Sequence, residues 1–384
     1  MLYFASHHQE PPHIAGAGLS VRRLVKSCAG RDFRWSNGLI LACLLWFAGL
    51  SSGQGQTGYQ PGQTYFGRSN YIEYIAGDLP VIFSVPHGGS LTPPEIPDRN
   101  CAGCSPDCAT ITDANTDELA RAIQQAFRNY YGHSPHVIIC RLKRTKVDCN
   151  REIEEAAAGN AYAQQAWREF HDYINSASSA VVASTGRGLY IDLHGQSHPL
   201  KRVELGYLLT AEQLTNTDAV LNQPAYAAQS SFRTLASQVP IPFSQLLRGS
   251  NSFGGLLLAK GYPSLPDSVM GSPWSGPSSK ASVGDLALYF GGGYNTRRHS
   301  SVGEGGSVDG LQMEVNLEGV RDTAANRTHF AFALAQTMDC FFVTHYRLNL
   351  RTGASLPAST AKPAELRTDS TLLPSQRRLV RMSP

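Results

Sequence analysis

Short apolar runs alternate with stretches of helical periodicity along the middle of the chain. The runs 81–85 and 189–193 have the length and composition of buried strands. Between them, Leu119, Ile123 and Phe127 recur at four-residue spacing, which predicts a helix. Strands alternating with helices, without an internal repeat, predict a single α/β domain.

The same patterns predict the remaining elements. Further strands are expected at 136–142, 204–210 and 311–316, and helices at 113–130, 152–183 (one broken helix or two), 219–239 with a break near Pro224, and 324–346. Thr112 or Asp113 is available to cap the first of these helices, and Asp218 the third. The stretch 249–310 is rich in Gly, Ser and Pro, and such a long irregular stretch is usually functional or mobile.

The two ends of the chain differ from its centre. The one strongly apolar run, 39–50, has twelve residues, fewer than the roughly 20 that a membrane span needs. Basic residues precede it and small residues follow it, as in a secretory signal. We therefore expect 1–55 to be a signal, with a short signal anchor as the alternative, and the protein to be secreted. A flexible leader is expected at 53–65 and a disordered tail at 351–384.

Charge and cysteine content narrow the classes of protein. The formal net charge of +3 over 384 residues, concentrated at the two ends, does not suggest a nucleic-acid partner. An even number of cysteines in an exported chain predicts up to three disulfides. A metal knuckle is the alternative for the first three. Asn326 begins a glycosylation sequon. The six cysteines beyond residue 55 are Cys101, Cys104, Cys108, Cys140, Cys149 and Cys340.

Two strand-like runs each lead into a His-Gly pair. His87 follows the run 81–85, and His194 follows the run 189–193. A histidine at the carboxyl end of a strand lies where open α/β sheets bind their ligands. Two such imidazoles can share a metal ion, and imidazole is a common ligand of zinc.

A catalytic zinc has three protein ligands and one open position. Asp113 is the favoured third ligand because it precedes the helix that follows the first strand. Glu118 and Glu95 are the alternatives for this ligand, and a helix cap is the alternative role for Asp113.

Other polar groups accompany these histidines. Arg144, Asp148, Asn150 and Arg151 follow the strand at 136–142 and form either an anchor for a substrate carboxylate or a surface ion-pair cluster. Glu314 lies inside an apolar strand, where a charge is costly unless it is paired or functional. The glycine-rich turn at 291–297 either closes over a substrate or is a plain loop.

Six short motifs occur in a fixed order and together resemble the N-formylglutamate amidohydrolases, a branch of the zinc-carboxypeptidase-like hydrolases. The resemblance covers about 79–342. The motifs are Pro-His-Gly-Gly at 86–89, Asp113 with Asp-Glu-Leu at 117–119, Val-Asp-Cys-Asn-Arg at 147–151, Asp-Leu-His at 192–194, Gly-Gly-x-x-Thr at 292–296 and Leu-Gln-Met-Glu-Val-Asn at 311–316.

The resemblance implies a fold and a set of roles. It implies a three-layer α/β hydrolase domain at 56–350, with a mixed, mostly parallel sheet between helices and one zinc ion. It implies that Glu314 is the general base and that the anchor residues bind the substrate carboxylate and polarise the carbonyl. By this resemblance the site residues are the metal ligands His87, Asp113 and His194, the catalytic residues Glu314 and Arg144, and the substrate-binding residues Asn150, Arg151 and Thr296.

The export signal and the cysteines depart from the typical intracellular member of that family, and Cys149 inside the anchor motif is expected to tie this loop to another cysteine. We therefore expect a secreted zinc amidohydrolase that cleaves a C–N bond in a small, carboxylate-bearing N-acyl amino acid or short peptide. The alternatives are a secreted binding or matrix protein with the same fold, or a glutamyl-peptide hydrolase. No stable membrane span is expected.

Overall fold

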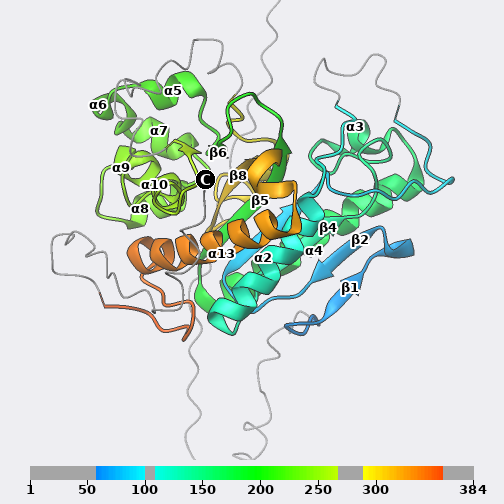
Figure 1. The fold of residues 1–384 in the computed structure, drawn as a ribbon, viewed down its shortest axis with the longest axis horizontal. Coiled ribbons are helices and arrows are strands. Elements are labelled where there is room, and N and C mark those ends of the chain that lie inside the picture. The colour runs from blue at the N-terminus through cyan, green and yellow to red at the C-terminus, as the bar shows by residue number, and fades with distance from the viewer. Residues whose placement is uncertain (1–57, 100–108, 267–288, 358–384) are drawn as a thin grey trace, which may run out of the picture. The chain divides into compact units, whose positions relative to one another are not determined.

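A computed structural model describes residues 58–99, 109–266 and 289–357. These residues form one mixed eight-stranded sheet in the order β1-β2-β4-β3-β5-β8-β6-β7, with helices on both faces (Figure 1). The three-layer α/β architecture with a mixed sheet is therefore confirmed. The strands are β1 (Thr64–Phe66), β2 (Ile72–Ile75), β3 (Val81–Val85), β4 (His136–Cys140), β5 (Gly188–Gln196), β6 (Val203–Gly206), β7 (Ser264–Leu265) and β8 (Val308–Asn316).

The four central strands, β4, β3, β5 and β8, run parallel to one another. On one side β2 pairs antiparallel with β4, and on the other β6 pairs antiparallel with β8. Strands covered on both faces carry near-continuous apolar sequence. The sequence of β3 and β4 follows this rule, since every residue of both strands is buried.

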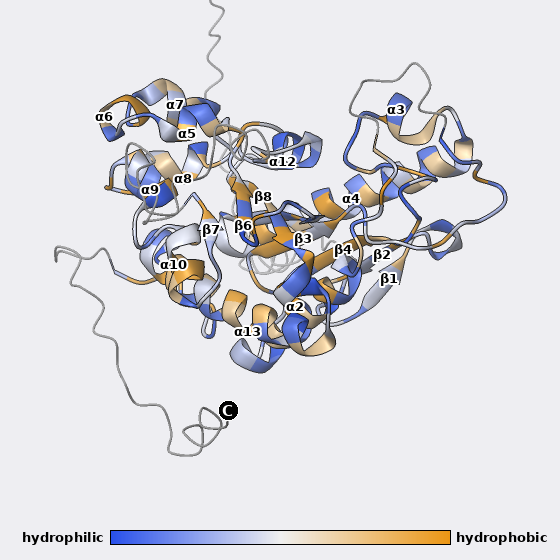
Figure 2. Ribbon diagram, turned by 45° about the horizontal axis from the view of Figure 1, so that its top comes forward, coloured by the Kyte–Doolittle hydropathy of each residue, from blue (hydrophilic) through white to orange (hydrophobic). Residues whose placement is uncertain are grey.

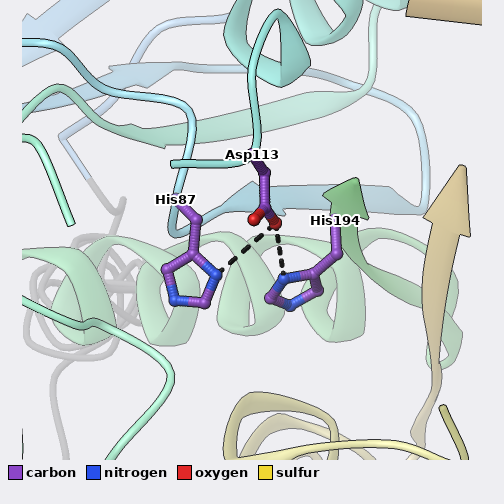
Figure 3. Close-up of side chains that lie close together, drawn as sticks. All are labelled: His87, Asp113 and His194. Carbon is purple, nitrogen blue, oxygen red and sulfur yellow. Dashed lines mark hydrogen bonds and ion pairs between the residues drawn. The ribbon is translucent and has the colours of Figure 1, made fainter. Parts of the chain in front are cut away.

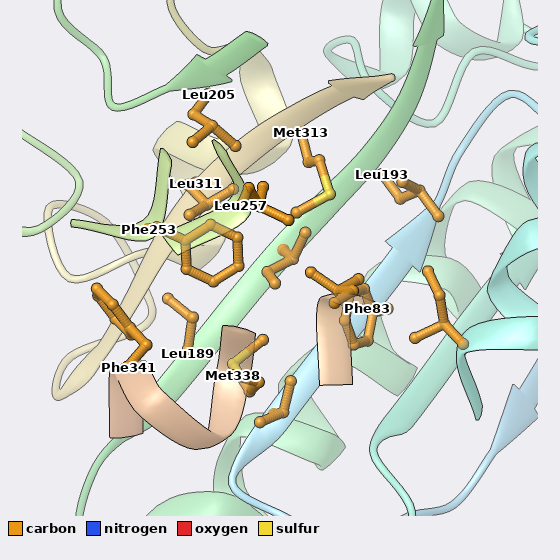
Figure 4. Close-up of a cluster of buried hydrophobic side chains, with 14 of the residues drawn as sticks. Phe83, Leu189, Leu193, Leu205, Phe253, Leu257, Leu311, Met313, Met338 and Phe341 are labelled. Carbon is orange, nitrogen blue, oxygen red and sulfur yellow. The ribbon is translucent and has the colours of Figure 1, made fainter. Parts of the chain in front are cut away.

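Alternation along the strands sorts their side chains between two apolar layers. Phe83, Leu193 and Met313 pack in the layer that contains residues of α2 (Thr116–Tyr131) and α13 (Ala324–Phe341) (Figure 4). Ile82 and Tyr190 point to the opposite layer, which contains residues of α4 (Ala161–Thr185). The outer surface of α2 carries polar residues, so this helix buries one apolar face against the sheet (Figure 2).

The connections place a switch in strand order beside β3. The chain leaves β3, passes through α2 and enters β4 on one side of β3. It then passes through α3 (Ile153–Ala157) and α4 and enters β5 on the other side of β3. In open α/β sheets, ligands bind beyond the carboxyl ends of the strands at such a switch point. The fold therefore places the ends of β3 and β5 at a site suited to binding.

Short helices fill the region between β6 and β8. The predicted helix 219–239 is three helices, because Pro224 begins a new one and Ser230 interrupts the next. Thr217, rather than Asp218, caps the first of them. The stretch 249–310 is less irregular than expected, since it contains a helix, a strand and a second helix. The helices are α5 (Ala211–Thr215), α6 (Asp218–Leu221), α7 (Pro224–Gln229), α8 (Arg233–Gln238), α9 (Phe243–Arg248), α10 (Phe253–Ala259) and α12 (Tyr294–His299).

The start of the domain also differs from the prediction. β1 begins at Thr64, inside the expected leader, and β2 was not predicted. All four residues of β2 (Ile-Glu-Tyr-Ile) are buried, so its sequence lacks the regular alternation of a strand with one exposed face. Its antiparallel pairing with β4 defines it as a strand. Its buried Glu73 forms an ion pair with Arg121 of α2.

Several expectations fall outside the described residues, namely the apolar run 39–50, the first three candidate disulfide cysteines and all but the first seven residues of the tail 351–384. Cys140, Cys149 and Cys340 carry free thiols, so the expectation that they form disulfides is wrong in this structure. Cys140 and Cys149 are instead buried in the apolar layer beside α4, where a thiol packs as a small hydrophobe. In the part of the chain described here, no helix has the length and apolar character needed to cross a membrane.

Candidate metal centre and active site

Three side chains meet at the carboxyl ends of β3 and β5. His87 follows β3, His194 lies near the end of β5, and Asp113 projects from the loop before α2 (Figure 3). Asp113 Oδ2 lies 3.2 Å from His194 Nδ1 and 3.5 Å from His87 Nδ1. One donor atom from each residue lies within 4.8 Å of the other two. The three predicted metal ligands therefore lie together in the fold.

The backbone holds Asp113 at this point. Its N–H donates to the carbonyl of His87 at 3.0 Å, and its Oδ2 accepts the N–H of Gly195 at 3.0 Å. α2 begins only at Thr116, with Asn115 as its N-cap at a φ of 63°. The alternative role of Asp113 as the helix cap is thus wrong, and its carboxylate is turned toward the histidines.

A carboxylate holds the outer nitrogen of each imidazole. His87 Nε2 lies 2.7 Å from Asp148 Oδ1, and His194 Nε2 lies 2.8 Å from Asp192 Oδ2. Such carboxylate–histidine pairs orient the ligands of zinc sites and leave the inner nitrogen for the metal.

The inner nitrogens fit this arrangement. His87 Nδ1 is buried and has no hydrogen-bond partner among the described residues. Two imidazole nitrogens and one carboxylate oxygen are also a ligand set of catalytic zinc sites. The donor atoms, including a buried imidazole nitrogen without a hydrogen bond, therefore suit a single zinc ion.

The two outer carboxylates are held ionised by their surroundings. Burial alone would raise the pKa of Asp148, but His87, Arg144 and Arg99 outweigh it and hold this pKa well below its usual value. Burial also opposes ionisation of Asp192, and His194 together with nearby hydrogen-bond donors lowers its pKa. Both carboxylates can therefore accept hydrogen bonds from the imidazoles.

Glu314 lies next to this cluster on the adjacent strand. In the parallel pairing of β5 and β8, Glu314 is the register partner of His194, and its side chain is on the face opposite Met313 and Val315. Gln312 Nε2 donates to Glu314 Oε1 at 2.9 Å. Burial raises the pKa of Glu314 to about 8, with His194 acting against the rise and nearby carboxylates adding to it. A carboxylate with a raised pKa beside a candidate metal centre is suited to proton transfer.

A cavity of about 740 Å³ opens over these groups. The predicted anchor residues Arg144, Asn150 and Arg151 line it together with the metal cluster and Glu314. Arg144 Nε donates to Asp148 Oδ2 at 3.0 Å, which fixes its guanidinium at the wall. Two cationic side chains that line the same cavity are suited to bind a carboxylate.

A glycine segment forms another wall of the cavity. A Cβ atom at Gly293 would lie 2.8 Å from Asn150 Nδ2 and 2.9 Å from Gln312 Oε1. Only glycine permits this close approach without displacing the two amides. The three glycines of the predicted turn, 291–293, therefore border the cavity, whereas Thr296 of the same turn, predicted to bind substrate, is fully buried in α12 and is not among the lining residues.

The other predicted candidates lie apart from the cluster. Glu118 interacts with Asp117 on α2, and Glu95 accepts a hydrogen bond from Tyr71. Neither belongs to the metal cluster. Cys149, expected to bridge the anchor loop to another cysteine, is a buried free thiol.

The sequence analysis did not identify the roles of several residues of the site. Asp192 could have been found, because it precedes His194 by two positions and so shares its strand face. Asp148 was noted, but as part of a substrate anchor rather than as the partner of His87. The sequence analysis also gave no role to Glu204, Asn295 or Arg321. Asn295 donates to Asp192 Oδ1, Glu204 contacts His198, and Arg321 donates to the carbonyl of Gln196.

No family model matches the sequence, and no curated protein matches it. Among solved structures, N-formylglutamate amidohydrolase from Ralstonia eutropha is 12% identical, with a TM-score of 0.39, over 77% of this chain and 100% of that one. A gene product of Agrobacterium tumefaciens is 14% identical, with a TM-score of 0.35, over 70% and 92%. An N-acetylmuramyl-L-alanine amidase from Mycobacterium abscessus is 11% identical, with a TM-score of 0.28, over 68% and 98%. The family that the motifs resemble is thus among the structural neighbours, at low identity.

Proposed function

We propose that this protein is a zinc-dependent amidohydrolase that cleaves a C–N amide bond in a small, carboxylate-bearing N-acyl amino acid or short peptide. The observation that carries the proposal is the buried cluster of His87, Asp113 and His194, whose donor atoms face one another beneath a cavity. Bound zinc supplies a Lewis acid that polarises a carbonyl and activates water.

The protein's own residues account for the remaining chemistry. Glu314 takes a proton from the attacking water and gives it to the leaving amine, a role that suits a buried carboxylate with a pKa of about 8. Arg144 and Arg151 at the cavity wall hold the substrate carboxylate and so fix the position of the scissile bond. Asp148 and Asp192 keep the two imidazoles in place.

We also propose that the protein is exported. The support is the signal-like run at 39–50, with basic residues before it and small residues after it. Glycosylation at Asn326 belongs to the same proposal. This residue lies in the first turn of α13, where its amide donates to Asp322 at 2.8 Å.

Metal analysis of the purified protein tests the proposed enzyme directly. We expect one zinc per chain, and we expect His87→Ala or His194→Ala to lose it while the fold is retained. His133→Ala is the matched control, because His133 is 44% exposed and lies on the surface beside Asp78. Full zinc content in both site variants would place the metal elsewhere and remove the basis of the proposal.

A further inference from the structure

A second polar cluster lines the cavity apart from the metal ligands. Glu204 of β6 has no exposed surface, and three nitrogen groups lie within hydrogen-bond distance of its carboxylate. His198 Nδ1 lies 2.9 Å from Glu204 Oε1, Arg202 Nε donates to the same oxygen at 3.2 Å, and the Phe290 N–H donates to Oε2 at 3.1 Å. Both His198 and Phe290 line the cavity. Glu204 therefore holds two cavity-lining residues in fixed positions.

These contacts determine which imidazole nitrogen of His198 carries the proton. A carboxylate paired with a guanidinium only accepts hydrogen bonds, so Nδ1 of His198 must donate to Glu204. In the neutral form of the imidazole, Nε2 is then the acceptor. Among the described residues no hydrogen bond to this nitrogen is present. A substrate group that donates a hydrogen bond can therefore bind there.

Phe290 supplies an apolar surface at the same point. Its ring is stacked on the imidazole of His198, with centroids 4.9 Å apart and an angle of 14° between the planes. Phe290 nevertheless remains 43% exposed. An exposed aromatic ring at a cavity wall is suited to contact an apolar ligand group.

The glycine segment limits the distance between the His198–Phe290 pair and the anchor residue Asn150. Gly291, Gly292 and Gly293 connect Phe290, which is bonded to Glu204, with the point where Gly293 meets Asn150. Three residues span at most about 10 Å. The cavity volume of about 740 Å³ also falls in the range of roughly 300–1,000 Å³ that holds drug-sized ligands. The cavity therefore has room for a substrate larger than a formyl amino acid.

We propose that His198 and Phe290 form the acyl-side subsite, which takes an aminoacyl group with an aromatic or other apolar side chain. This inference rests on the proposed amidohydrolase function. The substrate carboxylate binds at the arginines, the apolar side chain contacts Phe290, and an N–H of the aminoacyl group donates to His198 Nε2. Glu204 is a positioning residue that orients both contacts. A formyl group has neither the apolar surface nor the donor for this subsite.

Steady-state kinetics with two matched substrates test the subsite. We expect the zinc-loaded protein to hydrolyse phenylalanylglutamate with a kcat/KM at least about 10-fold higher than that for N-formylglutamate. Phe290→Ala and His198→Ala should each lower this ratio about 10-fold, mainly through the KM for the dipeptide, with zinc content retained. Phe332→Ala is the control, since Phe332 is also exposed at 45% but does not line the cavity.

The outcomes separate this inference from the proposed function. If the protein hydrolyses N-formylglutamate as efficiently as the dipeptide, or if both variants keep the parental ratio, the subsite is refuted and the amidohydrolase stands. If neither substrate is hydrolysed, the assignment of N-acylglutamate substrates to the proposed amidohydrolase fails. Calorimetric titration with phenylalanylglutamate then tests whether the subsite binds this dipeptide. Weaker binding to both variants than to the parent supports the subsite, and equal binding refutes it.

Discussion

Glu314 is bonded differently from the other buried acids of the site. Asp148 and Asp192 each face an imidazole, whereas the side-chain hydrogen bond of Glu314 comes from the neutral amide of Gln312. Burial favours the protonated form of this carboxyl and outweighs the opposing effect of His194, so the pKa of Glu314 is raised to about 8. At the scale of single residues, the hydrogen-bond partner therefore distinguishes Asp148 and Asp192, which orient a histidine, from Glu314, the candidate general base.

Replacing Glu314 tests this assignment. Glu314→Gln should lower kcat by about a hundred- to ten-thousand-fold, the usual cost of removing a general base. Zinc affinity should be retained, because Glu314 is not one of the clustered donors. Single-turnover kinetics and metal titration measure the two effects separately. Glu318→Gln, on a carboxylate that is 75% exposed, is the control. Near-parental turnover in Glu314→Gln would remove Glu314 from the mechanism.

At the scale of elements, one buried guanidinium connects the segments that carry the site. Arg321 Nε donates to the carbonyl of Val315 at 3.1 Å, and Nη2 donates to that of Gln196 at 3.0 Å. Nη1 donates to the carbonyl of Ala114. These carbonyls lie within two residues of Glu314, His194 and Asp113. The guanidinium also packs on Gly195, where a Cβ would lie 2.4 Å from its Cζ.

Arg321→Met should therefore loosen the metal centre without removing a ligand. Because hydrogen bonds from a charged group contribute about 1.5–3 kcal/mol each, we expect at least a 10-fold weaker zinc affinity and a lower melting temperature of the metal-free protein. Chelator competition and thermal unfolding measure these effects. Arg128→Met, on the exposed face of α2, is the matched control. Unchanged zinc affinity in Arg321→Met would contradict this role.

At the scale of the whole molecule, buried neutral histidines make the fold sensitive to acid. His136 in β4 accepts the N–H of Gly77 at Nδ1, so protonation of this nitrogen breaks a hydrogen bond in the interior. Burial lowers the pKa of His136 from 6.5 to about 4 and that of His299 to about 3. Since the folded pKa lies below the unfolded one, the stability that His136 contributes is complete above pH 6.5 and is lost as the pH falls toward 4.

His136→Asn removes the titrating group and keeps an acceptor near the position of Nδ1. Between pH 7 and pH 4, the free energy of unfolding should fall less in this variant than in the parent, by about 2–3 kcal/mol for a shift of this size. Urea unfolding across this pH range measures the difference. The exposed His133→Asn serves as control and should follow the parent. If His136→Asn also follows the parent, burial of His136 does not cause the acid sensitivity.

The sequence by itself determined the features that depend on neighbours along the chain. The apolar runs defined β3, β5 and β8, and the His-Gly pairs marked where two of these strands end. The period of a strand puts Glu314 and Met313 on opposite faces of β8, and Met313 packs in the apolar layer. A local pattern carries this information because a strand's period fixes which side chains share a face.

Only the tertiary structure decided the contacts between distant segments. It places Asp113, rather than Glu118 or Glu95, at the position of the third metal ligand, because the order β4-β3-β5 brings the loop before α2 beside both histidines. It joined Asp148 to His87 and Glu204 to His198, and it left Cys140 and Cys149 as buried thiols rather than disulfides. A side chain's partner depends on strand order and register, which no pattern within a single segment specifies.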